Sequence, residues 1–307
     1  MSTALYTLEN PHWQVGILPE TGGSVAFGRI RRDEQWHDVL RPTAEADYGN
    51  ASACASFIML PWANRLRDAR FSFDGSVYQL QPSSADGTAI HGVARKLPWR
   101  VISADRTHIR LLFDTALFEQ VNYPFAFSAE AEYRLDGQEF IMTVALRNEA
   151  QQAIPVGFGH HPYFLRAPAS EDNAVQLQLP CDLQYTLTNA LADAPPHPIQ
   201  PASDFRSLRA LDNAQHDDLL TGRASADQPM RIVYPAWSLA LDFYADAIFE
   251  HVLLFAPVGK PFFALEPQTN ANDGFNLRAQ GIASAGVIVL EPDETTQGIC
   301  RLAIQRL

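Results

Sequence analysis

Short apolar segments recur along most of the chain, and turn-forming residues separate them. Many of these segments alternate polar with apolar or aromatic positions; the clearest cover residues 108–115, 127–135, 139–148, 174–180, 238–244, 251–257 and 286–292. A period of two is typical of β-strands that bury one face. Only residues 117–120 and 204–211 suggest helical turns. The pattern therefore predicts an all-β protein built as a large antiparallel β-sandwich.

The length and the spacing of the strands predict one domain covering residues 1–307. A chain of 307 residues with 47% hydrophobic content can bury a large core. Residues 189–203 hold four of the 21 prolines and are the best candidate for a linker. We interpret them as an ordered surface crossing, because too little chain follows for a second large core.

Charge and cysteine content narrow the classes of partner. The formal net charge of −12 would repel nucleic acid and anionic membranes, so a small neutral molecule is the expected ligand. The three cysteines are widely spaced and predict buried thiols in place of a disulfide framework. No apolar run approaches the roughly 18 residues expected of a membrane-spanning helix, and no leader pattern is evident. We therefore expect a soluble, cytoplasmic monomer or homodimer.

Two adjacent histidines lie in the apolar and aromatic run Val156 to Phe164, VGFGHHPYF. The glycines and Pro162 argue against a helix and favour a strand that ends at a turn. Successive side chains of a strand point to opposite faces, so His160 and His161 should do so too. One of them could line a cleft, and a buried structural histidine is the alternative explanation.

Polar residues at the ends of other predicted strands could join such a cleft. Asn64 and Arg65 precede a strand beside Trp62, and a guanidinium there could bind a ligand or form a surface salt bridge. His91 is followed by Gly92, where the backbone could approach a bound molecule. Each of these signals is weak when it is taken alone.

Two acidic positions are also candidates. Glu266 ends the apolar strand FALE, where a carboxylate serves either as a general base or as a member of a structural ion pair. Asp217 and Asp218 lie between a polar loop and two leucines, and could bind a ligand or cap a turn.

The spacing of histidines and cysteines does not match a zinc motif, and the chain lacks a nucleophile elbow and a glycine-rich phosphate loop. We therefore expect no metal and no cofactor. With these classes of chemistry set aside, the reaction that we expect is acid–base chemistry by histidine and glutamate on a neutral substrate.

Four stretches in order resemble the aldose 1-epimerase (galactose mutarotase) family: ANRLRDARFSFDG, IHGVARKLPW, YPFAFSAEAEYRL with GFGHHPYF, and ALEPQT. The resemblance implies a galactose mutarotase-like supersandwich in which His161 is the general acid and Glu266 the general base. It implies that Arg65, with its neighbour Asn64, and His91 bind the sugar. Asp217 matches the family's sugar-binding aspartate when the chain is anchored on Thr221-Gly222.

The implied activity is interconversion of the α and β anomers of a free aldose, with Trp62 or Phe275 stacking on the sugar. Two alternatives stay open: a hexose-6-phosphate 1-epimerase, with cations from Arg67, Arg95 and Lys96, and a non-catalytic carbohydrate-binding sandwich. The chain departs from many mutarotases at His160, where they have Asn, and at residues 270–273, where they have a Pro-Asp pair. These departures leave the identity of the sugar open.

Overall fold

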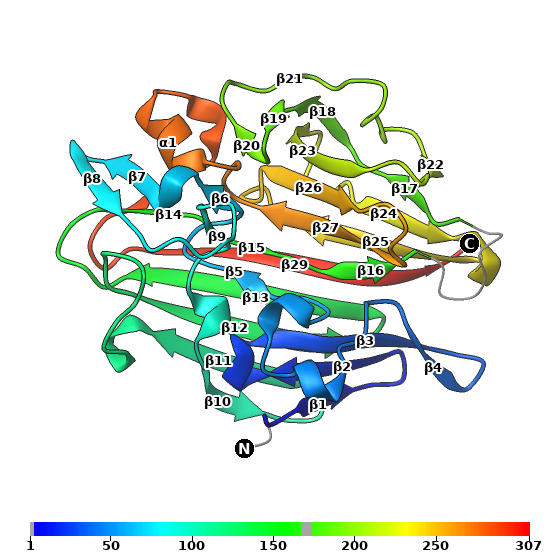
Figure 1. Ribbon diagram of the computed structural model, residues 1–307. Coiled ribbons are helices and arrows are strands. Elements are labelled where there is room, and N and C mark those ends of the chain that lie inside the picture. The colour runs from blue at the N-terminus through cyan, green and yellow to red at the C-terminus, as the bar shows by residue number, and fades with distance from the viewer. Residues whose placement is uncertain (1–2, 167–173) are drawn as a thin grey trace.

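Antiparallel pairing organises the strands of the computed structural model, which describes residues 3–166 and 174–307 (Figure 1). The longest sheet has nine strands in the order β10 (Arg100–Ala104), β11 (His108–Asp114), β12 (Phe127–Asp136), β13 (Glu139–Asn148), β29 (Thr295–Arg306), β25 (Leu239–Ala245), β24 (Met230–Tyr234), β17 (Gln176–Gln178) and β22 (Arg209–Ala210). The four-stranded sheet is β1 (Tyr6–Glu9), β2 (Trp13–Leu18), β3 (Ser24–Arg32) and β4 (Gln35–Asp38).

A third sheet carries the polar residues expected to line a cleft. Its order is β21 (His197–Pro198), β18 (Cys181–Gln184), β23 (His216–Arg223), β26 (His251–Ala256), β27 (Phe262–Gln268), β15 (Gly159–His160) and β5 (Ile58–Met59), and β16 (Tyr163–Leu165) also pairs with β27. Strands from distant parts of the sequence therefore become neighbours, because β27 lies between β26 and the segment that contains the two histidines.

The expected alternation accounts for the sandwich. In β12 every second residue from Phe127 to Leu135 is buried, and in β13 the same holds from Phe140 to Asn148. One hydrophobic cluster joins side chains of all three large sheets, among them Val15 of β2, Val144 of β13 and Leu254 of β26. The prediction of an all-β antiparallel sandwich is confirmed.

Short elements connect the sheets. Four two-stranded pairs are β6 (Arg65–Leu66) with β9 (Ala89–Ile90), β7 (Arg70–Phe73) with β8 (Ser76–Gln79), β14 (Ile154–Val156) with β28 (Ile288–Leu290), and β19 (Leu187–Thr188) with β20 (Leu191–Ala192). The 3₁₀ turns are η1 (Pro19–Thr21), η2 (Glu45–Asp47), η3 (Ala51–Ala53), η4 (Arg67–Ala69), η5 (Ala94–Lys96), η6 (Thr115–Leu117), η7 (Pro235–Trp237) and η8 (Ala283–Ala285).

The helical positions differ from the sequence prediction. The α-helix is α1 (Gly274–Ala279), only six residues long, and it packs against β7 at one end of the molecule (Figure 1). Residues 204–211 form no helix and end in β22, whereas 187–198 contain short strands of an ordered crossing. A single helical turn carries too little periodicity to be recognised. Among the described residues, no helix has the length and apolar character needed to cross a membrane.

Candidate active site

The register of the eight-stranded sheet places two acidic side chains on one face. Leu253 of β26 pairs with Glu266 of β27 and also with Leu219 of β23. Residues directly opposite each other in a sheet share a face, and so do residues two apart in one strand. Asp217, two residues before Leu219, therefore lies on the same face as Glu266.

The two histidines point to opposite sides, as the sequence predicts, and the strand β15 that precedes His161 is closely packed. At Gly159 a Cβ atom would lie only 2.6 Å from the Pro267 carbonyl oxygen, so a side chain there would push β15 away from β27. The backbone N–H of His161 donates to the Phe57 carbonyl. His161 turns toward Glu266, whereas His160 lies 6.5 Å from the ring of Phe249 in the core between the sheets.

His161 and Glu266 form a buried pair. The imidazole Nε2 lies 3.1 Å from the Glu266 Oε1, and their side chains are 6% and 0% exposed. Neither carboxylate oxygen accepts a well-aligned hydrogen bond, and His161 Nδ1 also lacks a partner in the described part of the chain. Buried polar atoms without partners carry a desolvation cost that a bound hydroxyl group could relieve.

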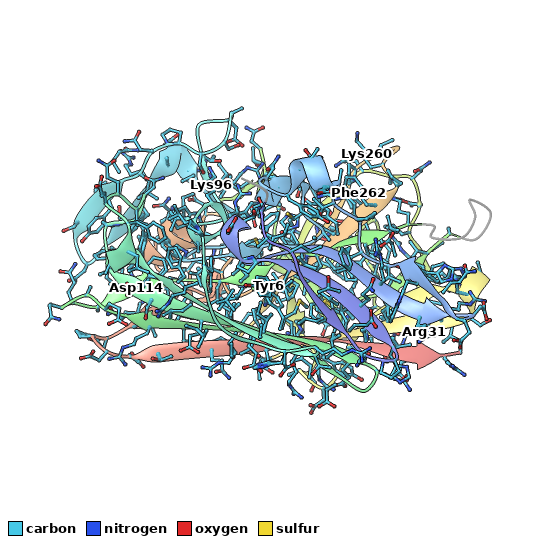
Figure 2. All side chains as sticks on the ribbon, turned by 90° about the horizontal axis from the view of Figure 1, so that it is seen from below. Tyr6, Arg31, Lys96, Asp114, Lys260 and Phe262 are labelled. Carbon is cyan, nitrogen blue, oxygen red and sulfur yellow. The ribbon has the colours of Figure 1, made fainter. Side chains whose placement is uncertain are left out.

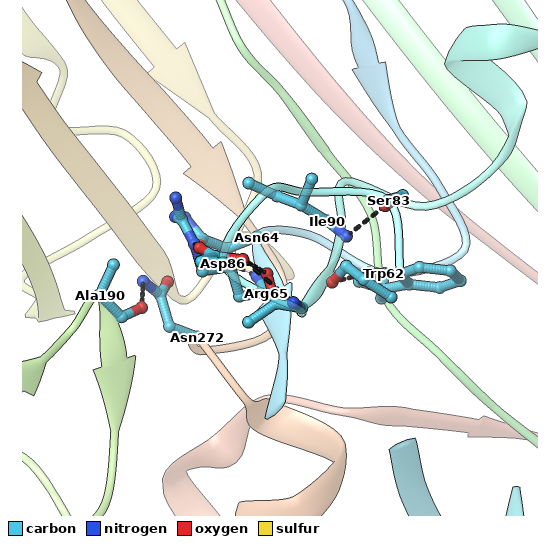
Figure 3. A network of polar contacts seen from close by, with 10 residues as sticks. Trp62, Asn64, Arg65, Ser83, Asp86, Ile90, Ala190 and Asn272 are labelled. Carbon is cyan, nitrogen blue, oxygen red and sulfur yellow. Dashed lines mark hydrogen bonds and ion pairs between the residues drawn. The ribbon is translucent and has the colours of Figure 1, made fainter. Parts of the chain in front are cut away.

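Arg65 is held by its neighbours at the start of β6 (Figure 3). Asn64 adopts a left-handed backbone (φ 55°), and its amide oxygen accepts from the Arg65 backbone N–H at 2.9 Å and from the guanidinium at 3.4 Å. The Arg65 Nε donates to Asp86 at 2.9 Å. Asn64 is buried and thus orients Arg65, whose charge acts on both Glu266 and Asp217.

His91 reaches the same pair from β9. Its backbone is left-handed (φ 58°), and its N–H donates to the Asn64 carbonyl at 2.8 Å. The imidazole meets the His161 ring edge to face at a centroid distance of 5.2 Å. Gly92 has a role different from the expected one: a Cβ there would lie 1.9 Å from the Leu60 carbonyl oxygen, so its close approach is to the chain itself.

Burial shifts the pKa values of the acid and the base of the pair in opposite directions. It raises the pKa of Glu266 well above its ordinary value, and the Asp217 carboxylate adds to the rise while Arg65 opposes it. Burial also lowers the pKa of His161 well below its ordinary value, and the charges of Arg95 and Arg41 lower it further. Both effects favour the neutral forms of the two side chains.

The pKa values of the residues next to the pair are shifted for the same reason. Burial lowers the pKa of His91, and the charge of His161 contributes. Burial raises the pKa of Asp217, although Arg65 counteracts it. A cluster of neighbouring side chains with perturbed pKa values is the usual physical signature of proton-transfer chemistry.

The structure brings together His161, Glu266, Arg65, His91 and Asp217, which come from five separate segments. The other candidate acid, Asp218, points to the opposite face and pairs with His216, whose Nδ1 lies 2.7 Å from Asp218 Oδ2. Those two residues belong to the core side of β23.

The prediction that Trp62 or Phe275 stacks on the sugar is wrong. Trp62 is fully buried, its indole N–H donates to the Ala89 carbonyl, and its ring packs against Tyr123. Phe275 is equally buried against Phe71. Both rings are core residues because the hydrophobic cluster between the sheets is continuous beneath the site.

Sequence reasoning missed the aromatic rings that flank His161. Phe57 and Tyr163 each have ring centroids 4.5 Å from the imidazole, and the Tyr163 hydroxyl lies 3.5 Å from His161 Nε2. Burial raises the pKa of Tyr163 to about 12, which keeps the hydroxyl protonated. Gln268 was also missed: its buried Oε1 has no partner in the described chain, and it lies on the face of Glu266. The strand period places Gln268 there, two residues after Glu266.

Metal-ligating geometry is a separate question from sequence spacing. Over residues 3–166 and 174–307, no group of three or more His, Cys, Asp or Glu side chains is arranged to hold a metal ion. The site is thus a cluster of imidazole, carboxylate and guanidinium groups on one face of an antiparallel sheet.

An antiparallel supersandwich with this arrangement of sheets defines the class of galactose mutarotase-like proteins. The aldose 1-epimerase family model matches residues 4–301, and the chain belongs to that family. Solved structures agree on the fold. A putative aldose 1-epimerase of Escherichia coli K12 has a TM-score of 0.84 at 22% identity, covering 99% of this chain and 100% of the other.

A galactose mutarotase-like protein of Clostridium acetobutylicum also has a TM-score of 0.84, at 16% identity, covering 100% of this chain and 99% of the other. Among sequence relatives, the uncharacterized protein YphB of E. coli K12 is 24% identical over 99% of both chains. The aldose 1-epimerase of E. coli K12 is 25% identical over 52% of this chain and 47% of its own length.

Proposed function

We propose that the protein is an aldose 1-epimerase that interconverts the α and β anomers of an aldose through His161 and Glu266. The observation that carries the proposal is the buried imidazole–carboxylate pair, whose nitrogen and oxygen lie 3.1 Å apart. A hemiacetal needs one proton removed from its anomeric hydroxyl and one delivered to its ring oxygen, and a pair that shares one proton can do both.

The proton balance closes over one turnover. Glu266 takes the proton of the anomeric hydroxyl while protonated His161 donates to the ring oxygen, so the bond between C1 and the ring oxygen breaks and C1 becomes an aldehyde. Rotation about the C1–C2 bond exposes the other carbonyl face. Both protons then return, the ring closes as the other anomer, and the pair is restored to its first state.

The directions of the two pKa shifts correspond to one stage of this cycle, the open-chain aldehyde. The open-chain aldehyde coexists with protonated Glu266 and neutral His161, which is the form that burial favours. The form with ionised Glu266 and protonated His161 carries the same number of protons. Hydroxyl groups of a bound sugar would replace the direct contact of the pair and solvate its charges.

The remaining polar groups would bind the sugar and stabilise the charge that develops on its oxygen atoms. Arg65 and His91 would fix sugar hydroxyls and stabilise negative charge developing on oxygen, and Asp217 would accept from a hydroxyl group. Asn64 would act through Arg65, whose backbone N–H and guanidinium it binds. The unpartnered Gln268 Oε1 is a further acceptor on the same face.

The test is polarimetry over a panel of freshly dissolved sugars and sugar phosphates. We expect equilibration faster than in buffer, and Glu266→Gln and His161→Asn should each lower kcat by roughly 10²- to 10⁴-fold, the usual worth of a positioned proton-transfer group. The double variant should be little worse than either single one, because the pair acts as a unit.

Matched controls are available in the same chain. Glu250→Gln changes a glutamate at the surface whose pKa is also raised and which the mechanism does not use. His160→Asn changes the neighbouring histidine on the opposite face. Both should keep kcat in the folded protein; a fall of only a few-fold for Glu266→Gln, with a lower Tm, would make Glu266 a structural residue.

A further inference from the structure

A polar loop before β9 supplies a carboxylate that binds Arg65 (Figure 3). The Asp86 Oδ2 accepts from the Arg65 Nε at 2.9 Å, and the Asn64 Oδ1 accepts from the Arg65 Nη1 at 3.4 Å. Two of the three guanidinium nitrogens are therefore held, and the third, Nη2, has no partner among the described residues. Because a guanidinium is planar and rigid, the two held nitrogens determine where the third one points.

The loop that carries Asp86 is itself fixed by hydrogen bonds. The Asp86 Oδ1 accepts from the backbone N–H of Thr88 at 3.0 Å and from its hydroxyl at 2.6 Å. The Ser83 hydroxyl oxygen accepts from the Ile90 N–H at 2.9 Å, and Ile90 pairs with Arg65 between β9 and β6. The carboxylate thus has a defined position relative to the strand that carries Arg65.

The contact between Asp86 and Arg65 joins two full charges. Burial alone would raise the pKa of Asp86, but hydrogen bonds from Thr88 and Arg65 lower it below its ordinary value, so the carboxylate stays ionised. Hydrogen bonds between charged partners are stronger and better oriented than those between neutral groups. The Asp86 side chain is 43% exposed, and such a pair adds little to the stability of the fold. Its main effect is therefore the orientation of Arg65.

The orientation of Arg65 matters to the general base. Glu266 interacts with ionisable side chains from four segments: His161, Tyr163, Asp217 and Arg65. Burial and Asp217 raise the pKa of Glu266, and the charge of Arg65 opposes them. Because the energy between two charges falls as their distance grows, this opposition depends on where the guanidinium is held.

We propose that Asp86 is a positioning residue of the reaction, which holds the Arg65 guanidinium so that its third nitrogen meets the sugar and its charge stays close to Glu266. This inference rests on the proposed function, because Arg65 and Glu266 are taken from that mechanism. Without the carboxylate, Arg65 keeps only its contact to Asn64, and its side chain, already 24% exposed, turns toward solvent.

The test is Asp86→Asn, assayed by polarimetry with whichever of glucose, galactose and xylose is equilibrated fastest. The amide has one acceptor oxygen in place of two, so it cannot serve both Thr88 and Arg65. We expect KM to rise by roughly 3- to 10-fold, the worth of one hydrogen bond. The alkaline limb of kcat/KM should move to higher pH, because the Arg65 charge that lowers the pKa of Glu266 then lies farther away.

A double-mutant cycle shows whether Asp86 acts through Arg65. Arg65→Gln should move the alkaline limb in the same direction and further, and adding Asp86→Asn to it should change neither KM nor the limb again. Additive effects of the two changes would overturn the proposal. So would an unchanged KM and limb in Asp86→Asn, or a limb that moves to lower pH, which is the result expected if Asp86 acted on Glu266 by its own negative charge.

Asp105 offers a matched control. Its Oδ1 accepts from the N–H of Thr107 at 2.8 Å and from the hydroxyl at 3.3 Å, the same turn at the same spacing, but no arginine donates to it in the described chain. The turn precedes β11, which ends at the Asp114 labelled in Figure 2, and β10 and β11 form the edge of the nine-stranded sheet, not of the sheet that carries Glu266. Asp105→Asn should leave KM and both limbs unchanged.

Failure of the proposed function can be distinguished from failure of the positioning role. If no sugar is equilibrated, the enzyme proposal fails, and a pH titration of the Glu266 carboxyl carbon by ¹³C NMR still tests whether Asp86 positions Arg65. The pKa of Glu266 should be higher in Asp86→Asn than in the wild-type protein and unchanged in Asp105→Asn. An unchanged or lower pKa in Asp86→Asn would overturn the positioning role.

Discussion

At the scale of single residues, the site depends on a glutamate and a histidine whose pKa values shift in opposite directions. Both side chains are buried, so each is pushed toward its neutral form, and Asp217 and Arg95 push in the same directions. The pair therefore takes up its second proton below the ordinary pKa of His161 and loses its last one above the ordinary pKa of Glu266.

This ordering predicts a broad bell in the dependence of kcat/KM on pH. With ordinary pKa values of 4.5 for Glu266 and 6.5 for His161, the active state would exist mainly between those values. The shifts place the acid limb, where His161 takes up the second proton, below 6.5, and the alkaline limb, where Glu266 loses the last one, well above 4.5. Stopped-flow polarimetry across pH measures both limbs.

Asp217→Asn gives an internal check on the same profile. Removing that carboxylate takes away a cause of the raised Glu266 pKa, so the alkaline limb should move to lower pH. A wild-type optimum confined between pH 4.5 and 6.5, the two ordinary values, would contradict the ordering of the pair.

The buried carboxylate should also lower stability at neutral pH. In the unfolded chain Glu266 ionises above 4.5, whereas in the folded chain its pKa is raised. The folded state therefore holds a proton that the unfolded state releases, and stability falls as pH rises from the unfolded value toward the folded one, by up to about 1.4 kcal/mol per pH unit.

Glu266→Gln should consequently have a higher Tm than the wild-type protein at pH 7 and the same Tm below pH 4.5, the ordinary pKa of the group. Differential scanning calorimetry at both pH values measures this. A variant that is less stable at pH 7 would mean that the carboxylate is stabilised by its surroundings, which is the structural explanation left open by the sequence.

At the scale of elements, a buried asparagine joins the end of β27 to the segment before β6. The Asn270 Oδ1 accepts from the Ala63 N–H at 3.0 Å, and its Nδ2 donates to the Ala63 carbonyl at 3.1 Å and to Ala271 at 2.9 Å. Asn64 and Arg65 follow directly. The Asn270 side chain is thus one of the links between the glutamate strand and the arginine segment, beside the Asp273 N–H that donates to the Arg65 carbonyl.

Asn270→Ala should destabilise the protein by about 2–4 kcal/mol, because two buried backbone groups of Ala63 lose their partner. It should also raise KM, since Arg65 is no longer held in place. Denaturant unfolding and sugar titration of the rate measure the two effects.

Asn122→Ala is the matched control, because Asn122 forms the same bridge to the N–H and carbonyl of one residue, Gln81, but at an exposed position. It should cost less than about 1 kcal/mol and leave KM unchanged. Equal effects of the two variants would show that the Asn270 bridge has no special part in the site.

At the scale of the whole molecule, one hydrophobic cluster connects side chains of the three large sheets. A shared core makes the sheets depend on each other for stability. We therefore predict one cooperative unfolding transition, with coincident curves from tryptophan fluorescence and from far-ultraviolet circular dichroism. Two separated transitions would contradict the prediction of a single domain over residues 1–307.

The sequence by itself determined the local features. Alternation predicts β12 and β13 because side chains of a strand point to opposite faces, and the same rule separates His160 from His161. The motif resemblance gave the family and named the residues expected in the pocket. The sequence did not predict helix α1, because six residues are too few to show a helical period of apolar positions.

Only the tertiary structure decided which side chains meet. Strand order brings β27 beside both β26 and β15, so Glu266 lies against His161 although 104 residues separate them in the chain. Burial then sets the pKa directions and places Trp62 and Phe275 in the core. Periodicity is fixed by the backbone within a few residues, whereas these contacts depend on how distant strands pair and pack.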